Sequence, residues 1–339
     1  MVAGLTHRRA IVVGAGQSGL AVAAALIAHG LRAQHDFVVI DEASVGHRRW
    51  ASRWHSMELL SDARHSALPI RQFPGDQRRH PRADEMNEYL AKVESDLGVE
   101  VVWGVRADAV QQRGDGSTLL LSTSAGDVQT RNVVCATGAA AHPRLPDWAR
   151  GLTAPGVVIH SSEYLYPRQI PTPEVLIVGG GNSGVQLARE LSAFHRVTLS
   201  IRTPRSHAAL ARYPSAAGGR RSMWSRTLHR EPAFGDRYQD LQRAGVTLSP
   251  AVATADGGTL RLADGAEMSP GSVILATGYR PAVQWLPDTA RAAPRRSTIT
   301  GVPGLFVAGM PEYGGRGADT LVRVWRDAAA IARQITDRP

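Results

Sequence analysis

The sequence predicts an α/β protein made of two domains with parallel sheets. One observation is that a buried strand, a glycine-rich turn and a helix follow one another twice, from residue 9 and again from residue 175. A second is that the strands of both patterns are runs of β-branched residues, which is typical of strands buried on both faces of a sheet. The third is the length of 339 residues, because single cores tend to split above roughly 250–300 residues. We therefore expect two Rossmann-like domains.

The composition narrows the class of protein. The chain is 43% hydrophobic and carries a formal net charge of +9. Because Lys92 is the only lysine, this charge is nearly all arginine, and it is scattered along the chain. We therefore expect no nucleic-acid partner. The longest apolar stretch, residues 20–28, is far shorter than the ~20 residues of a membrane span. The first apolar run leads into a glycine pattern rather than a cleavage site, so we expect a cytoplasmic protein with no membrane partner.

The first pattern begins with a predicted strand at residues 9–13, followed by glycines at G-x-G-x-x-G spacing and a predicted helix at residues 18–28. In this motif the first glycine makes the turn, the second lets the backbone approach a pyrophosphate, and the third lets the helix pack on the strand. A second strand, residues 37–40, ends at Asp41, near the position of a carboxylate that binds a ribose hydroxyl. Glu42 is the alternative for this contact. The predicted contacts with the dinucleotide are Gly14, Gly16, Gln17, Ser18, Gly19, Asp41 and Glu42.

The same pattern returns near the middle of the chain. Strands are predicted at residues 175–178 and 197–201, with a helix at residues 185–194 between them. The second strand ends at Arg202, where the first pattern has an acid. A guanidinium in this position hydrogen-bonds the 2′-phosphate of NADP, whereas an acid repels it. Arg205 stands close by, and a solvated strand end is the alternative interpretation of Arg202. The predicted contacts with NADP are Gly179, Gly181, Asn182, Ser183, Gly184, Arg202 and Thr203.

Two dinucleotide sites with different strand ends favour one held and one exchanging cofactor. This arrangement indicates hydride transfer from a nicotinamide to a flavin. Cys135 is the only cysteine, so the chain has no CxxC pair, and we interpret this residue as a small buried hydrophobe. We find no metal-ligand spacing among the 12 histidines and expect no metal site.

Several further motifs carry a family resemblance. Ala136-Thr137-Gly138 and Ala276-Thr277-Gly278 each follow a predicted strand, at residues 132–135 and 272–275. Residues 50–60 contain two tryptophans, and residues 156–164 match the pattern F-x-G-x-x-x-H-x-x-x-[YW] except that Ala154 replaces the Phe. Residues 304–309 precede a predicted helix at residues 319–335. With these motifs, the chain resembles the flavoproteins that have two dinucleotide-binding domains, and among them the flavin-containing monooxygenases.

The resemblance implies a discontinuous FAD-binding domain, residues 1–160 and 279–339, with an NADP-binding domain at residues 161–278 inserted into it. It places Asp62 near the oxygen-reaction site, although this residue is equally suited to be a helix N-cap. It also places His160 near the NADP side of the domain linker, where a hydrogen-bonded linker histidine is the alternative. The further residues that it implies for FAD are Trp50, Ala107, Ala136, Thr137, Gly138, Gly309, Thr320 and Leu321, and those for NADP are His160, Ser161, Ala276, Thr277 and Gly278.

The resemblance further implies an NADPH-dependent monooxygenase. In such enzymes NADPH reduces FAD, O2 forms a C4a-(hydro)peroxyflavin, and one oxygen atom passes to a small organic substrate at nitrogen, sulfur or a related heteroatom, or in the oxidative decarboxylation of a 2-oxo acid. The alternatives are a reductase of the same architecture, of the quinone or ferredoxin type, and a flavin-binding redox sensor without turnover. The sequence leaves open whether the chain forms a homodimer. Residues 204–235 are expected to form an irregular excursion, and a helix is expected at residues 84–96.

Overall fold

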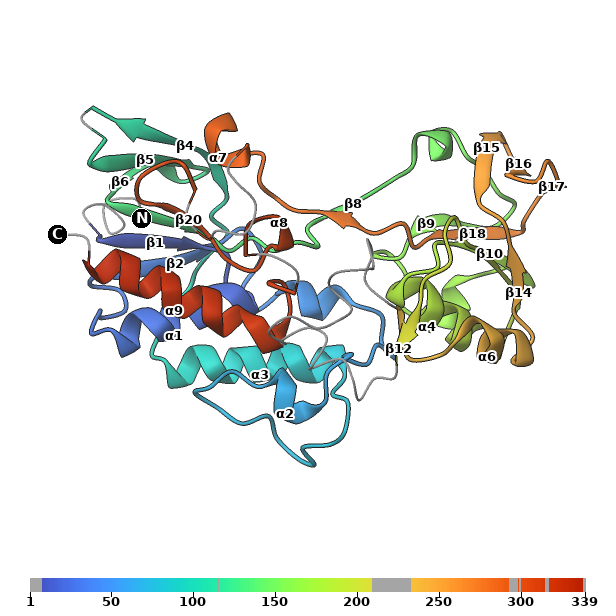
Figure 1. The fold of residues 1–339 in the computed structure, drawn as a ribbon, viewed down its shortest axis with the longest axis horizontal. Helices are drawn as coiled ribbons and strands as arrows, with labels where there is room; N and C mark the ends of the chain where they lie inside the picture. Colours follow the sequence, from blue (N-terminus) through green and yellow to red (C-terminus); the bar gives the residue numbers. More distant parts are fainter. Residues whose placement is uncertain are drawn as a thin grey trace. The chain divides into compact units, whose positions relative to one another are not determined.

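The structure is a computed structural model that describes residues 8–114, 116–208, 233–292, 298, 300–314 and 317–337 (Figure 1). The chain divides into two compact units. Unit 1 comprises Met1–Ala51, Asp62–Ala141 and Pro281–Pro339, and unit 2 comprises Ser52–Ser61 and His142–Arg280.

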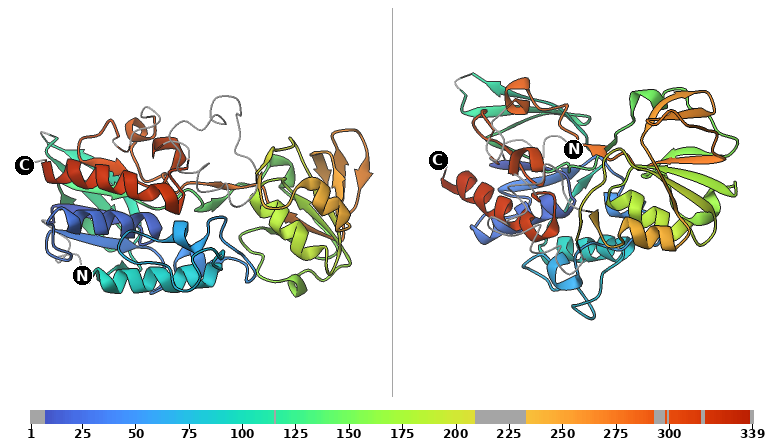
Figure 2. Two further views of the ribbon diagram at one scale, coloured as in Figure 1. Left: turned by 60° about the horizontal axis from the view of Figure 1, so that its bottom comes forward. Right: turned by 45° about the vertical axis from the view of Figure 1, so that its right-hand side comes forward.

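Unit 1 is built on a five-stranded parallel sheet. Its strand order is β20-β7-β1-β2-β3, and every neighbouring pair is parallel. Helix α1 packs against α9 and α3, and the two views of Figure 2 show α9 (red) beside α1 (blue). The strands are β1 (Ala10–Val13), β2 (Phe37–Asp41), β3 (Val102–Trp103), β7 (Asn132–Cys135) and β20 (Leu305–Val307), and the helices are α1 (Gln17–Ala28), α3 (Ala83–Asp96) and α9 (Leu321–Asp337).

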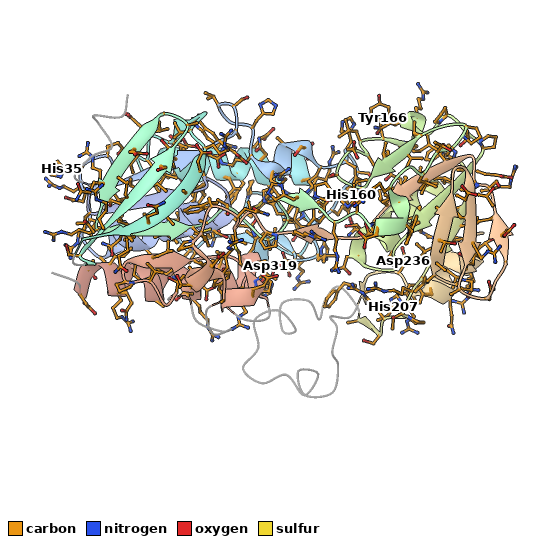
Figure 3. All side chains as sticks on the ribbon, turned by 90° about the horizontal axis from the view of Figure 1, so that it is seen from above. His35, His160, Tyr166, His207, Asp236 and Asp319 are labelled. Atoms are coloured by element: carbon orange, nitrogen blue, oxygen red, sulfur yellow. The ribbon has the colours of Figure 1, made fainter. Side chains whose placement is uncertain are left out.

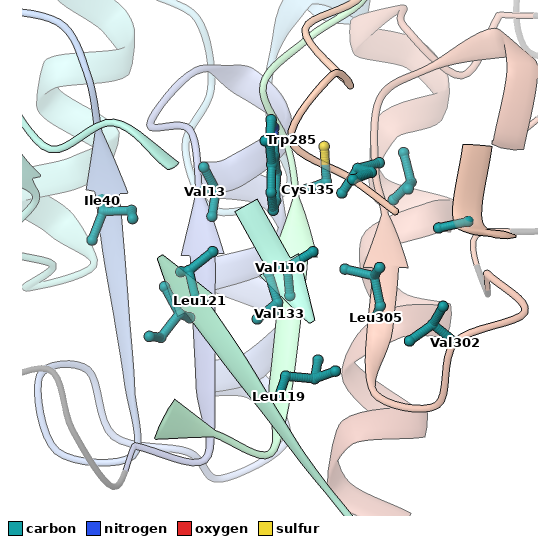
Figure 4. Close-up of a cluster of buried hydrophobic side chains, with 14 of the residues drawn as sticks. Val13, Ile40, Val110, Leu119, Leu121, Val133, Cys135, Trp285, Val302 and Leu305 are labelled. Carbon is teal, nitrogen blue, oxygen red and sulfur yellow. The ribbon is translucent and has the colours of Figure 1, made fainter. Parts of the chain in front are cut away.

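A three-stranded antiparallel sheet is inserted before β7 and covers part of the parallel sheet. It consists of β4 (Ala107–Arg113), β5 (Thr118–Thr123) and β6 (Gly126–Thr130). Alternate residues of β5 are buried, as the two-residue period of a strand with one covered face requires. Leu119 and Leu121 of β5 share a hydrophobic cluster with Ile11 and Val133 of the parallel sheet (Figure 4).

Unit 2 repeats this plan. Its parallel sheet has the order β14-β11-β10-β18-β9, and its own antiparallel sheet of three strands is inserted before β18. Helix α4 packs on β10 and β11 and contacts α6. The strands of the parallel sheet are β9 (Val158–His160), β10 (Glu174–Val178), β11 (Arg196–Ser200), β14 (Thr247–Ser249) and β18 (Ser272–Leu275); the antiparallel strands are β15 (Val252–Asp256), β16 (Thr259–Leu262) and β17 (Glu267–Met268); and the helices are α4 (Asn182–Leu191) and α6 (Tyr238–Arg243).

The remaining elements are short. Two of them, β8 and β19, pair with each other in antiparallel orientation, and β12 pairs with β13. Their bounds are η2 (Arg49–Ser52), α2 (Ala63–Ser66), β8 (His142–Pro143), η3 (Asp147–Ala149), η4 (Pro167–Gln169), β12 (His207–Ala208), β13 (Ala233–Phe234), β19 (Tyr279–Arg280), α7 (Asp288–Arg291) and α8 (Pro311–Gly314). In the part of the chain that the structure describes, every helix is too short or too polar to span a lipid bilayer.

The predicted α/β class and both parallel sheets are confirmed. Helix α4, which follows the second glycine pattern, begins three residues before its predicted start at residue 185 and ends at Leu191 rather than at residue 194. The C-terminal helix begins at Leu321 rather than at residue 319. Within the expected excursion at residues 204–235, the structure shows the short pair β12–β13, and residues 209–232 lie outside the described residues.

The compact units differ from the predicted domain boundaries at residues 160 and 279. Residues 142–160 belong to unit 2, because β9 pairs with β18 in the second sheet. The segment Ser52–Ser61 also belongs to unit 2, since Trp54 is buried in the core of that unit beside Tyr164 and Ile177. Neither assignment could be read from periodicity, because both depend on which sheet receives a short segment.

Candidate functional site

The first glycine loop, residues 14–19, has the geometry of a phosphate cradle. Gly14 has a φ of +110°, and a Cβ there would lie 2.5 Å from the carbonyl oxygen of Ala136. A Cβ on Gly19 would lie 1.7 Å from the oxygen of Gly14. In contrast, a Cβ on Gly16 would meet nothing within 4 Å. Two glycines are therefore required by close packing, while the middle one leaves the face in front of α1 open, as a bound pyrophosphate requires.

Asp41 at the end of β2 holds this loop. Its Oδ2 accepts a hydrogen bond from the N–H of Ala15 at 2.7 Å, and its Oδ1 accepts one from the N–H of Ala43 at 2.9 Å. Each carboxylate oxygen can accept a second hydrogen bond, so these two bonds leave capacity for a ribose hydroxyl. That contact stays a prediction. Glu42 is exposed beside it. The observed bonds show that Asp41 fixes the glycine loop, a role that the spacing between the glycines and the acid did not predict.

Four segments of unit 1 meet at the start of α1. The side chain of Gln17 donates to the carbonyl oxygen of Asp319 at 2.9 Å and accepts from the indole N–H of Trp50 at 2.9 Å. Ser18 is buried, and a Cβ on Gly309 would lie 1.9 Å from its hydroxyl oxygen. The structure thus brings together four residues that were predicted for FAD from distant parts of the sequence.

The remaining residues predicted for FAD lie at the starts of other elements of unit 1. Thr320 lies just before α9, Leu321 begins that helix, and Ala107 begins β4. Their contacts with FAD stay predictions.

The two A-T-G motifs occupy equivalent places in the two units. The carbonyl oxygen of Ala136 approaches Gly14, and that of Ala276 approaches Gly179. The hydroxyl of Thr137 donates to the oxygen of Ala282 at 2.8 Å, and the hydroxyl of Thr277 donates to the oxygen of Arg144 at 2.5 Å. Each motif therefore closes one side of a glycine loop. The glycines that end the motifs, Gly138 and Gly278, have positive φ values of 86° and 89°.

The second glycine loop, residues 179–184, repeats the geometry of the first. Gly179 has a φ of +123°, and a Cβ there would lie 2.3 Å from the oxygen of Ala276. A Cβ on Gly184 would lie 1.8 Å from the oxygen of Gly179. Asn182, the first residue of α4, accepts a hydrogen bond from the N–H of Phe234 at 2.9 Å. Ser183 follows it in the first turn of the helix.

Arg205 brings a positive charge to the second loop. Arg202 and Thr203 are exposed just after β11. The guanidinium of Arg205 lies over the loop, since a Cβ on Gly181 would lie 3.5 Å from its Cζ. A guanidinium beside a helix N-terminus favours a phosphate for two reasons, the paired N–H donors and the positive end of the helix dipole. The residues present therefore fit an anionic dinucleotide.

His160 is the histidine of the family pattern and the last residue of β9 (Figure 3). It is 2% exposed. Its Nε2 lies 3.1 Å from the oxygen of Gly278, and its Nδ1 lies 2.9 Å from the hydroxyl of Ser162. Burial lowers the pKa of His160. The structure thus shows the hydrogen-bonded histidine that the sequence left as the alternative. Contacts of His160 and the buried Ser161 with NADP stay predictions.

Asp62 is the N-cap of α2. Its Oδ1 accepts hydrogen bonds from the backbone N–H of His65 at 3.0 Å and from the ring Nδ1 at 2.6 Å. Burial alone would raise the pKa of Asp62, but the hydrogen bonds from His65 outweigh it and lower that pKa. The N-cap predicted as one alternative is confirmed, and a catalytic role stays a prediction.

Cys135, at the end of β7, is fully buried, and burial raises the pKa of its thiol to about 11. It is therefore a protonated core residue, as the sequence indicated.

Two residues that the sequence did not reveal act on the loops. Arg48 donates from Nε to the carbonyl oxygen of Ala15 at 2.8 Å, and Tyr238 donates from its hydroxyl to the oxygen of Gly180 at 2.8 Å. Both reach backbone atoms across long sequence separations, and a backbone contact leaves no mark on the glycine pattern. Nothing in residue type or spacing could have identified them.

The comparisons with known proteins agree with this geometry. A family model described as pyridine nucleotide-disulphide oxidoreductase matches residues 11–309. The chain belongs to this family. A flavin-containing monooxygenase from Stenotrophomonas maltophilia has a similar structure, with 26% sequence identity, a TM-score of 0.79, and coverage of 98% of this chain and 99% of that one. A bacillithiol disulfide reductase from Staphylococcus aureus, at 16% identity and a TM-score of 0.73, covers 98% of this chain and 99% of that one and shares the fold.

Two curated relatives extend the comparison. The uncharacterized oxidoreductase CzcO of Bacillus subtilis is 27% identical over 350 residues, which cover 96% of this chain and 98% of that protein. The indole-3-pyruvate monooxygenase YUCCA1 of Oryza sativa subsp. japonica is 31% identical over 192 residues, which cover 54% of this chain and 44% of that protein. These likenesses confirm the predicted resemblance and the predicted class, an FAD-dependent oxidoreductase related to flavin monooxygenases, and they support the predicted cofactors.

Proposed function

We propose that this protein is an NADPH-dependent flavin monooxygenase that transfers one oxygen atom from O2 to a small organic substrate. The observation that carries the proposal is the presence of two phosphate cradles with opposite charge at the end of the following strand. Asp41 follows the first cradle, and Arg202 with Arg205 follows the second. An enzyme that keeps one dinucleotide and exchanges another needs two such sites.

The first cradle is assigned to FAD. The open face at Gly16 leaves room for the pyrophosphate, and the first N–H groups of α1 lie at that face without intrahelical acceptors. The hydrogen-bonded set of Gln17, Trp50 and Asp319 fixes the segments around the cradle. Bound flavin supplies the redox chemistry, accepting hydride and reacting with O2. The residues of the chain bind it, orient it and keep water away.

The second cradle is assigned to NADPH rather than NADH. The guanidinium of Arg205 lies over the loop, and Arg202 is exposed at the strand end where an NAD site carries an acid. A guanidinium contacts a 2′-phosphate through paired N–H donors, so either arginine suits NADPH better than an acid would.

A reductase is the competing assignment. A dithiol reductase needs a second thiol near the flavin, and the chain has one cysteine, which is buried and protonated. A quinone or ferredoxin reductase needs no thiol, so oxygen chemistry must be measured to separate it from a monooxygenase.

The test is stopped-flow absorbance of the flavin-loaded protein. NADPH should bleach the oxidised-flavin band near ~450 nm, and mixing with O2 should produce a transient near ~370–380 nm that decays faster with substrate. Bleaching without the transient would assign the protein to the reductases. No bleaching by NADPH or NADH would refute both and leave a redox sensor.

The substrate class is approached with three groups of small molecules: amines, thioethers and 2-oxo acids. The last group is included because one relative is named for indole-3-pyruvate, a 2-oxo acid. We expect one group to raise NADPH and O2 consumption together while peroxide release falls. Equal consumption with all three groups, accompanied by stoichiometric peroxide, would show that none is a substrate.

A further inference from the structure

Arg48 is a buried cation beneath the first glycine loop. The residue is 3% exposed, and its side chain is 1% exposed. Its Nε donates to the carbonyl oxygen of Ala15 at 2.8 Å, its Nη2 pairs with Glu94 of α3, and its Cζ lies 5.0 Å from the ring centroid of Trp103 in β3. A buried charge is costly unless it is paired and hydrogen-bonded. The fold therefore supplies three partners from separate segments to keep this guanidinium in place.

The bond to Ala15 sets the direction of the next N–H. In a trans peptide the C=O and the N–H point in opposite directions. With the oxygen of Ala15 directed toward Arg48, the N–H of Gly16 faces away from it. The preceding peptide is fixed as well, because the N–H of Ala15 is bound to Asp41 at 2.7 Å. Asp41 thus fixes the Gly14–Ala15 peptide, and Arg48 fixes the peptide between Ala15 and Gly16 through its carbonyl.

The same carbonyl is held in unit 2 by different chemistry. Gly180 occupies the position in the second loop that Ala15 occupies in the first, and its oxygen accepts a hydrogen bond from Tyr238 at 2.8 Å. Two unrelated side chains bind the equivalent carbonyl in two loops. This recurrence indicates that the orientation of the peptide matters for the function of the loop.

We propose that Arg48 is a positioning residue for FAD, which fixes the Ala15–Gly16 peptide so that the N–H of Gly16 is directed at the pyrophosphate before the cofactor binds. The inference rests on the assignment of the first cradle to FAD. Pre-organised donors bind more tightly because their ordering cost is met during folding rather than during binding. Glu94 and Trp103 act through Arg48 and do not themselves reach the loop carbonyl.

The experiment measures FAD binding to flavin-free protein by quenching of FAD fluorescence. Arg48→Met should raise the Kd for FAD at least about tenfold, the effect of losing one hydrogen bond from a charged donor. The double variant Arg48→Met/Glu94→Gln leaves no unpaired charge behind and should fold even if the single variant does not. It should show the same loss. Arg71→Gln is the matched control, since it removes a different arginine that pairs with α3, through Asp96 at the surface.

A second readout separates positioning from general destabilisation. Calorimetry with ADP and adenosine as probes should show weaker binding of ADP, which carries a diphosphate, and unchanged binding of adenosine. A folded double variant with FAD affinity within about twofold of wild type, or an equal loss for ADP and adenosine, would overturn the inference. Wild-type protein that binds no FAD would instead refute the proposed function.

Discussion

The two glycine loops have the same shape but are held and exposed differently. In both, a positive-φ glycine lies against the carbonyl of an A-T-G motif, and the last glycine packs against the first. The sheets also match strand for strand, with the order β3-β2-β1-β7-β20 in unit 1 and β14-β11-β10-β18-β9 in unit 2. Shape alone therefore does not distinguish the two candidate sites.

The difference lies in the side chains around the loops. The first loop is fixed from within by Asp41 and the buried Arg48, and its outer face at Gly16 is open. The second is fixed by the half-buried Tyr238 and carries the guanidinium of Arg205 on its face. Internal charges suit a rigid site for a cofactor that stays, whereas surface cations attract an anionic ligand that exchanges. The comparison supports the assignment of FAD to unit 1 and NADPH to unit 2.

The largest effect is expected from Gly184→Ala. A Cβ at this position would lie 1.8 Å from the backbone oxygen of Gly179, so α4 must move away from β10. We expect the Kd for NADPH to rise more than about 100-fold, while the flavin content per protein stays at the wild-type value. Loss of flavin in this variant would show that the two sites are not independent. Gly30→Ala, at an open surface position in unit 1 with positive φ, controls for general strain.

The arginines of the second loop come next. Arg205→Ala and Arg202→Ala should each raise the Kd for NADPH about 10- to 100-fold, as expected for loss of a charged hydrogen bond to a phosphate, and should change the Kd for NADH much less. The measurement is the rate of flavin reduction at increasing concentrations of either coenzyme. Arg196→Ala, which removes an exposed partner of Glu174 at the far end of β11, is the control. Equal effects on both coenzymes would contradict a 2′-phosphate contact.

Tyr238→Phe tests whether the second loop needs its carbonyl bound. The change removes the hydroxyl, which donates to the oxygen of Gly180 and accepts from the backbone N–H of Arg205 at 3.3 Å, but keeps the ring packed beside His207. We expect the Kd for NADPH to rise about three- to tenfold, the range for the loss of neutral hydrogen bonds at a loop. FAD affinity should not change. If Tyr238→Phe weakens FAD binding as Arg48→Met is expected to, the two loops would not be held separately.

The two glycine turns and the strands beside them could be predicted because they depend on residue types that are close together in the sequence. Strands β7 and β18 match their predicted ranges in full, since the three apolar residues directly before each A-T-G leave little choice of where the strand ends. The parts that could not be predicted depend on distant contacts. Arg48 reaches Ala15 over 33 positions, and Tyr238 reaches Gly180 over 58. The placement of Ser52–Ser61 in unit 2 likewise depends on the burial of Trp54. A hydrophobic pattern predicts that this tryptophan is buried, but it does not tell which of the two cores contains it.

A smaller effect is expected from pH at the edge of the second sheet. His160 in β9 pairs with Leu275 of β18. In the first sheet the equivalent of His160 is Val307 of β20, which pairs with Cys135 of β7. The last position of this strand therefore carries an imidazole in unit 2 and an aliphatic side chain in unit 1. Because burial lowers the pKa of His160 in the folded state, the unfolded chain binds the proton more readily. Stability is full above the unfolded pKa of about 6.5 and falls as pH decreases below it.

The measurement is the melting temperature between pH 7.5 and pH 5.5. His160→Gln should reduce the fall in melting temperature by roughly 2–4 °C, and a His55→Gln variant, which removes a different histidine of unit 2, should not. An identical pH profile in wild type and His160→Gln would show that His160 does not contribute to the pH dependence.

The smallest effect is expected from Cys135→Ala, and it tests the comparison at the level of chemistry. Cys135 in β7 occupies the place of Leu275 in β18, and burial raises the pKa of its thiol to about 11. If both residues serve only to fill a core, the variant should keep its rate of flavin reduction by NADPH and lose on the order of 1 kcal/mol of stability. The thiol of the folded wild-type protein should also resist alkylation at pH 8, because the reactive thiolate is scarcely populated. A large fall in the reduction rate, or rapid alkylation at pH 8, would show that Cys135 does more than fill the core of the first sheet.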